Sequence, residues 1–225
     1  MNRSVAATLI LGVLGLAVLL WLGVWQIQRL GWKADLLARI EAQIAADPVD
    51  LPADPDPDQD EYLPVRVTGQ LLLPEIRVLV SAKVVGPGYR IVTSFRTDDG
   101  RRIMIDRGFL SDKVPGEPPR PEGPVTFTGN LHWPDEVDSY TPDPDPVADL
   151  WFARDVPRMA IALETEPILV IARDSSQPVP PLSPMPVDTA AIPNHHLQYA
   201  ITWFALAAIW AGMILVMVRR IRQGR

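Results

Sequence analysis

The sequence is organised around residues 194–204, which read Asn194-His195-His196-Leu197-Gln198-Tyr199-Ala200-Ile201-Thr202-Trp203-Phe204 and open an apolar run that continues to Val218. Two of the three histidines of the protein lie here. In a helix, His196, Tyr199 and Trp203 share one face. Imidazole is a common ligand of metals and of haem iron, so this face is a candidate ligand site at the mouth of a membrane span. The alternative is an aromatic belt that anchors the helix end at the lipid headgroups.

A second apolar run covers residues 5–24, carries no charge and is long enough to cross a bilayer as a helix. A cleaved signal peptide is the alternative, because Arg3 gives the run a short basic start. The run is long for such a signal, and it is followed by Trp25 and Gln26 rather than by small residues. We therefore expect an uncleaved anchor.

Between the two runs, short alternating segments separated by Gly and Pro predict β-strands. Asp98-Asp99-Gly100 is a tight-turn signal and predicts a hairpin. A short helix is expected over Pro157–Glu164. The predicted strands, which favour an antiparallel barrel or sandwich, are Tyr62–Leu73, Ile76–Val85, Tyr89–Thr97, Arg101–Phe109, Val125–Trp133, Trp151–Arg154 and Ile168–Arg173.

The expected fold class is a membrane protein in which two transmembrane helices flank a mainly antiparallel β-domain of α+β type outside the cytoplasm. We divide the chain into a transmembrane helix (5–26), an amphipathic helix that leaves the membrane (27–47), a β-rich domain (60–175), a Pro-rich connector (176–195), a second transmembrane helix (196–218) and a basic tail (219–225).

Charge predicts the orientation and excludes one class of partner. All 27 acidic residues lie between Asp35 and Asp188, whereas seven of the 21 basic residues lie outside that span. So acidic a middle excludes nucleic acid as a partner. The arginines 219, 220, 222 and 225 directly follow the second span and favour the cytoplasmic side for both termini. We expect a multi-pass protein of the cell inner membrane with a periplasmic central domain.

Motifs of catalysis are scarce in this sequence. It has no cysteine, which excludes disulfides, thiol catalysis and iron–sulfur sites. No nucleophile elbow, P-loop, Rossmann fingerprint or HExxH motif is present. Asp106-Arg107-Gly108-Phe109 is interpreted as an ion pair at a strand end, with an arginine at a functional rim as the alternative. We therefore expect a protein that is not an enzyme.

Five sequence motifs together resemble the surfeit locus protein one family, the assembly factors of cytochrome c oxidase. The resemblance spans nearly the whole chain. Asp106 and Ser111 depart from the asparagine and proline that the family tends to have around Arg-Gly-Phe. The motifs are Leu22-Gly23-Val24-Trp25-Gln26 with Arg29 and Trp32-Lys33, Gly88-Tyr89-Arg90-Ile91-Val92-Thr93, Arg107-Gly108-Phe109, Trp151-Phe152-Ala153-Arg154-Asp155, and Asn194-x-His196-Leu197-x-Tyr199-Ala200-x-Thr202-Trp203-Phe204.

The resemblance implies a role in forming the haem a site of oxidase subunit I. His196 matches the family's proposed haem ligand, whereas His195 stands at a variable position of the motif. On this reading Tyr199, Trp203 and Trp25 cover the macrocycle, and Arg29 pairs with haem propionates or with lipid phosphate. The implied partners are subunit I, the haem a synthase and membrane lipid. The alternative function is a membrane-anchored scaffold that stabilises subunit I without binding haem.

Overall fold

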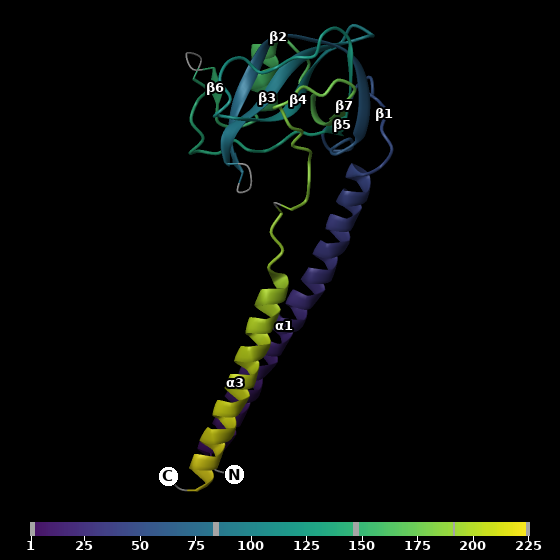
Figure 1. Ribbon diagram of the computed structural model, residues 1–225. Coiled ribbons are helices and arrows are strands. Elements are labelled where there is room, and N and C mark those ends of the chain that lie inside the picture. The colour runs from purple at the N-terminus through teal and green to yellow at the C-terminus, as the bar shows by residue number, and fades with distance from the viewer. Residues whose placement is uncertain (1–2, 83–85, 146–148, 191, 224–225) are drawn as a thin grey trace. The chain divides into compact units, whose positions relative to one another are not determined.

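The computed structural model describes residues 3–82, 86–145, 149–190 and 192–223. The chain forms two compact units (Figure 1). A helical unit comprises Met1–Arg39 and Thr189–Arg225, and a β-rich unit comprises Ile40–Asp188.

The helical unit contains most of α1 (Arg3–Ile44) and all of α3 (His196–Arg222), which run side by side in Figure 1. Both helices are long and apolar enough to cross a membrane by length and composition. At 1.5 Å per residue, the 42 residues of α1 extend for about 63 Å, roughly twice the hydrocarbon core of a bilayer. No helix break separates the predicted span 5–26 from the amphipathic segment 27–47 that extends it, and the helix ends at Ile44.

The β-rich unit is built around a closed barrel of five strands in the order β2-β3-β4-β7-β5, in which β5 pairs back onto β2. All neighbours in the ring are antiparallel except β4 and β7, which are parallel. The predicted mainly antiparallel fold is therefore confirmed, and it takes the barrel form. The strands are β1 (Val49–Asp50), β2 (Pro64–Ala82), β3 (Gly86–Thr97), β4 (Arg102–Ser111), β5 (Val125–Leu131), β6 (Leu150–Trp151) and β7 (Leu169–Ser175).

Strict alternation of side chains gives this unit two cores. In β4, Ile103 and Ile105 point into the barrel with Phe95 and Phe127, whose rings meet edge to face at 5.7 Å. Met104, between the two isoleucines, points outward and packs under α2 (Val156–Leu163). Strand β4 is thus buried on both faces, because the barrel interior covers one and the helix covers the other.

Local chemistry explains where α2 begins and ends. The Asp155 side chain caps the helix by accepting a hydrogen bond from Arg158 N, and Pro157 lies in the first turn, where its missing N–H costs nothing. Glu164 adopts a left-handed conformation (φ 53°) and ends the helix. These bounds lie within one residue of the predicted helix.

The Asp98-Asp99-Gly100 hairpin is confirmed as the connection between β3 and β4. Gly100 N donates to Thr97 O at 2.9 Å, and Gly100 has a φ of +93°, which favours glycine.

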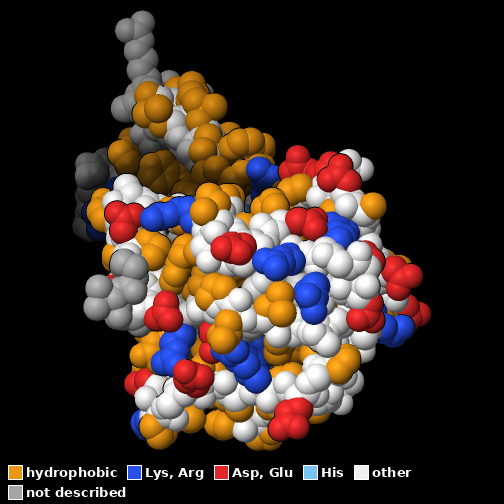
Figure 2. Space-filling model, turned by 90° about the horizontal axis from the view of Figure 1, so that it is seen from above, with side chains coloured by type: hydrophobic (Ala, Val, Ile, Leu, Met, Phe, Trp, Pro, Cys, Tyr) orange, Lys and Arg blue, Asp and Glu red, His pale blue; other side chains and the backbone are white. Residues whose placement is uncertain are grey.

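On the face of the β-rich unit seen in Figure 2, acidic, basic and apolar side chains are interspersed rather than segregated.

Two strand predictions were wrong. The strand expected over Trp151–Arg154 is reduced to the two-residue β6 (Leu150–Trp151), and residues 152–154 form bends and irregular chain before α2. Residues 62–73 and 76–85 were expected to form two strands, yet β2 is a single strand of 19 residues. Its register on β3 shifts between Leu71 and Glu75, so that the strand passes Pro74 through an irregularity instead of ending there. Residues 83–85 of the second predicted strand lie outside the described residues.

Candidate functional site

The helix pair is held together by close contacts at glycines. A Cβ atom at Gly23 would lie 2.7 Å from the Phe204 ring, and one at Gly15 would lie 2.8 Å from the Trp210 ring. Trp210 Nε1 also donates a hydrogen bond to the carbonyl oxygen of Gly12 at 3.0 Å. Small residues permit such close approach, which is how helices pack in membranes, where the hydrophobic effect contributes little between them.

One face of α3, here called the seam, turns toward α1. It consists of residues 196, 200, 203, 207 and 210, which follow one another at spacings of four and three residues. This spacing is typical of helices that pack against each other over several turns. Ala200 and Ala207 are almost fully buried, at 1% and 3% exposed. The half-buried members, with the alanines between them, are His196, Trp203 and Trp210. The seam places an imidazole at the end of the helix pair that is remote from Arg219–Arg222.

His196 is hydrogen-bonded across the seam. Its Nδ1 lies 2.8 Å from Oε1 of Gln26 on α1, and Gln26 is only 9% exposed. The facing amide atom is an oxygen, which can only accept, so this contact is a hydrogen bond when the imidazole carries its proton on Nδ1. Nε2 therefore keeps its lone pair, and among the described residues no hydrogen-bond donor occupies it. The sequence had not singled out Gln26 for this role, since 170 positions separate the two residues.

The remaining predicted site residues are only partly gathered around His196. Trp203 shares the seam with it, whereas Tyr199 is 55% exposed and lies outside the seam. Trp25 directly precedes Gln26 and is 39% exposed. Arg29 stacks on two rings, with its guanidinium carbon 5.8 Å from the Trp25 centroid and 5.0 Å from the Trp32 centroid. Such cation–π contacts hold the guanidinium in place while its N–H groups can still meet an anion.

The donor set fits a haem better than a bare metal ion. Within the part of the chain that the structure describes, no group of three or more His, Asp or Glu side chains could hold an ion. Protein sites for bare zinc or calcium need more ligands than one imidazole. A porphyrin brings four nitrogen ligands of its own, so one imidazole completes an axial position. Nearby, the buried Oδ1 of Asn194 has no hydrogen-bond partner among the described residues, which leaves an acceptor for a bound molecule.

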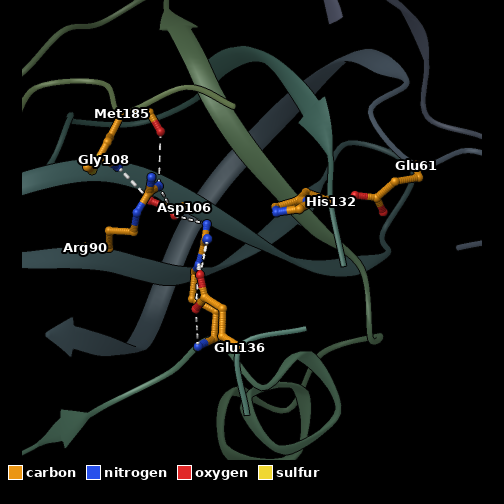
Figure 3. A network of polar contacts seen from close by, with 8 residues as sticks. Glu61, Arg90, Asp106, Gly108, His132, Glu136 and Met185 are labelled. Carbon is orange, nitrogen blue, oxygen red and sulfur yellow. Dashed lines mark hydrogen bonds and ion pairs between the residues drawn. The ribbon is translucent and has the colours of Figure 1, made fainter. Parts of the chain in front are cut away.

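In the β-rich unit, a polar network surrounds Asp106, whose side chain is fully buried (Figure 3). Arg90 donates to its Oδ2 at 2.7 Å, and the Gly108 N–H donates to its Oδ1 at 3.0 Å. Arg90 also donates to the Met185 carbonyl at 3.0 Å. The carboxylate thus accepts hydrogen bonds from β3 and β4, because a buried charge must be satisfied, and Arg90 in turn also binds the chain that follows the barrel.

Arg154 joins this network from the segment before α2. Its Nη1 lies 3.7 Å from Asp106 Oδ2, and its other guanidinium nitrogens bind both carboxylate oxygens of Glu136. Burial alone would raise the pKa of Glu136, but the hydrogen bonds and positive charge of Arg154 outweigh it and hold this pKa below its ordinary value. Glu136 is therefore a carboxylate at neutral pH.

Arg107 points to a separate cluster. Its Nη1 lies 3.6 Å from Oε2 of Glu75, which Arg120 approaches to 3.0 Å. Burial lowers the pKa of Arg107 to about 10, and the charge of Arg120 acts in the same direction while Glu75 opposes it. Arg107 and Phe127 line a cavity of about 60 Å³. Small-molecule sites span about 300–1,000 Å³, so a haem does not fit there.

The predicted ion pair at Asp106-Arg107 needs a correction. Both side chains do form ion pairs, but with different partners, Arg90 and Glu75, and both lie within β4 rather than at its end. Successive residues of a strand point to opposite faces, so they cannot share a partner. Motifs that lie far apart in the sequence meet at Asp106, because Arg90, Gly108 and Arg154, which contact its carboxylate, come from three of them.

The structure also places His132, the third histidine. Its Nδ1 contacts a carboxylate oxygen of Glu61, and its ring stacks on Tyr62 with the centroids 5.5 Å apart. Glu61 accepts from the Trp133 backbone N–H as well, at 3.1 Å. All of these residues lie in the β-rich unit, and the contacts join the entry of β2 to the exit of β5. The role is structural.

Comparison with known proteins agrees with the motifs. The model of the SURF1 family matches residues 13–208. Surfeit locus protein 1 of Homo sapiens is 33% identical over 211 residues, covering 83% of this chain and 69% of the human protein. The rat protein of the same name is 32% identical, with 83% and 68% covered. A SURF1-like protein of Monosiga brevicollis is 31% identical, with 88% and 83% covered.

Proposed function

The chain belongs to the SURF1 family, and on that basis we propose that it is a cytochrome c oxidase assembly factor that binds haem a and assists its insertion into subunit I. In this proposal the protein is a carrier and not an enzyme. Haem a is its transient cargo, and His196 is the axial ligand of the haem iron. In this proposal the haem a synthase is the donor, as the family resemblance implies, and subunit I is the acceptor.

The observation that carries the proposal is the hydrogen bond from His196 Nδ1 to Gln26, which leaves Nε2 with a free lone pair. Neutral imidazole with one free nitrogen is the form that binds haem iron. A single protein ligand also suits transfer, because the acceptor has only one bond to replace. When bound, the haem supplies the iron and the apolar macrocycle, and this chain supplies orientation and cover.

The other residues of the site have distinct roles in the proposal. Trp203, half-buried in the seam, and Trp25 and Tyr199, both partly exposed, offer aromatic surface to the macrocycle and its apolar tail. Arg29 is held over two indole rings and offers N–H groups to a propionate. Lipid phosphate is the competing anion for Arg29 at the membrane surface.

We further propose that the protein lies in the cell inner membrane with both termini cytoplasmic and the β-rich unit periplasmic. The last turn of α3 carries Arg219, Arg220 and Arg222, and basic residues that flank a span favour the cytoplasmic side. His196 lies at the opposite end of α3. The site would then face the outer leaflet.

A scaffold that stabilises subunit I without haem is the second candidate. The observation in its favour is that the seam already uses two tryptophans for packing. Trp210 donates a hydrogen bond to Gly12, and Trp203 is half-buried between the helices. These side chains therefore have a structural reason to be present, and haem is not needed to explain them.

The deciding experiment is an optical spectrum of the full-length protein, co-expressed with the enzymes of haem a synthesis and purified in mild detergent. We compare wild type with His196→Ala, and use His195→Ala as the matched control. A haem a spectrum that His196→Ala abolishes and His195→Ala preserves supports the carrier. A haem-free wild type on which oxidase assembly still depends supports the scaffold. Equal haem in all three proteins refutes His196 as the ligand.

A further inference from the structure

We propose that Gln26 is a positioning residue that selects the tautomer of His196 and sets the strength of its bond to iron; this inference rests on the proposed function. The geometry is the 2.8 Å contact between His196 Nδ1 and Gln26 Oε1. Gln26 is one of the few buried polar side chains of the described chain, at 9% exposed, in a helix whose neighbouring residues are mostly exposed.

Tautomer selection follows from the chemistry of the amide oxygen. It cannot donate, so the hydrogen bond exists only when His196 Nδ1 carries the proton. The outer torsion of a histidine is broad, and the ring turns readily when nothing holds it. Gln26 therefore fixes both the ring plane and the free nitrogen, and it presents Nε2 as the only ligand atom.

The identity of the acceptor sets how firmly iron is held. In lasting metal sites the second nitrogen of a ligating histidine often donates to a carboxylate, which raises the basicity of the ring. A neutral amide does the same more weakly, because charge-assisted hydrogen bonds are roughly twice as strong as neutral ones. Glutamine at position 26 thus orients the ligand while strengthening its bond to iron less than a carboxylate would, which suits a protein that must release its cargo.

The position of Gln26 links this geometry to the helix pair. Gly23, one turn earlier in α1, is buried against Phe204. Ala200, one turn after His196 in α3, is 1% exposed. The two residues of the hydrogen bond are therefore held by rigid backbone on both sides, which is what a fixed ligand orientation needs.

The test uses Gln26→Leu, Gln26→Glu and the matched control Gln28→Leu, an exposed glutamine of the same helix. First, we label histidine with ¹⁵N in the protein without haem and assign the His196 signal by its absence from His196→Ala. We expect a neutral ring protonated at Nδ1 in wild type and Gln28→Leu, and a mixture of tautomers in Gln26→Leu. A wild-type ring protonated at Nε2, or a Gln26→Leu ring identical to wild type, would overturn the inference whether or not haem binds.

The second readout is made on protein co-expressed with haem a synthesis. Gln26→Leu should lose about 10- to 100-fold in haem affinity, as expected for removal of a residue that orients a metal ligand. Gln26→Glu should retain haem more firmly and lower its midpoint potential, because a more basic imidazole favours ferric iron. Unchanged retention and potential in both variants, beside a haem-loaded wild type, would refute Gln26 while leaving the carrier intact. A haem-free wild type would refute the carrier instead.

Discussion

Replacing Asp106 tests whether the buried network of the β-rich unit stabilises the fold. The side chain is fully buried, and Arg90, which binds it, is 12% exposed. Asp106→Ala removes the carboxylate, so Arg90 and Arg154 each lose their ion pair with it. Breaking a buried ion pair from one side costs about 3–5 kcal/mol.

The structure favours the lower end of that range. Arg90 retains its hydrogen bond to the Met185 carbonyl, and Arg154 retains Glu136. We therefore expect a loss of about 3 kcal/mol in the free energy of unfolding. For a unit of this size each kcal/mol shifts the melting temperature by about 2–4 °C, so Tm should fall by about 6–12 °C.

Asp106→Asn separates charge from shape, because its amide oxygen can still accept from the Gly108 N–H. It should cost less than the alanine variant. The assay is thermal unfolding of the full-length protein in mild detergent, followed by circular dichroism of the β-rich unit. Asp112→Asn, an exposed carboxylate just after β4, is the matched control and should change stability by less than about 0.5 kcal/mol. If Asp106→Ala also stays within that margin, the reasoning about the network is wrong.

Two further predictions concern charge and packing. The folded pKa of Glu136 lies below its ordinary value of 4.5, so its contribution to stability is complete above that pH and is lost as the pH falls. Glu136→Gln should be less stable than wild type at neutral pH, and the gap should close below about pH 4.5 in denaturant titrations; a gap that is independent of pH would contradict this. In the helix pair, Gly23→Ala brings a Cβ to 2.7 Å from Phe204 and should lower the melting temperature in detergent, whereas Gly31→Ala meets nothing within 4 Å and should be neutral or slightly stabilising. Equal effects of the two alanines would argue against the close packing at Gly23.

Strands in which apolar and polar residues alternate regularly could be predicted from the sequence. Irregularities within a strand could not. The hairpin at Asp98-Asp99-Gly100 followed from turn chemistry alone. The apparent break at Leu73-Pro74 was misread, because proline usually ends a strand, and nothing local reveals that a register shift absorbs it. Strand β1 (Val49–Asp50) has two residues and no period to detect; it exists because β2 offers it a parallel partner.

Polar partners were the least predictable feature of both units. The sequence indicated that Asp106 and Arg107 form ion pairs, but their partners, Arg90 and Glu75, both lie at least 16 residues away in the sequence. The helical face that joins His196 and Trp203 was readable from spacing. The contact of Gln26 with His196 could not be predicted, because it depends on which faces of the two helices meet. The sequence of one helix does not specify this.

The hydrogen bond between Gln26 and His196 also bears on the order of events during synthesis. It joins residues 170 positions apart, and the bond from Trp210 to Gly12 spans 198. A ribosome releases α1 before α3, and the whole barrel is made between them. Gln26 therefore has no partner while the barrel is being made, and the orientation of the imidazole is set only after α3 has formed. Chains that stall before α3 lack His196, and chains that stall within α3 lack the helix contacts that orient its ring.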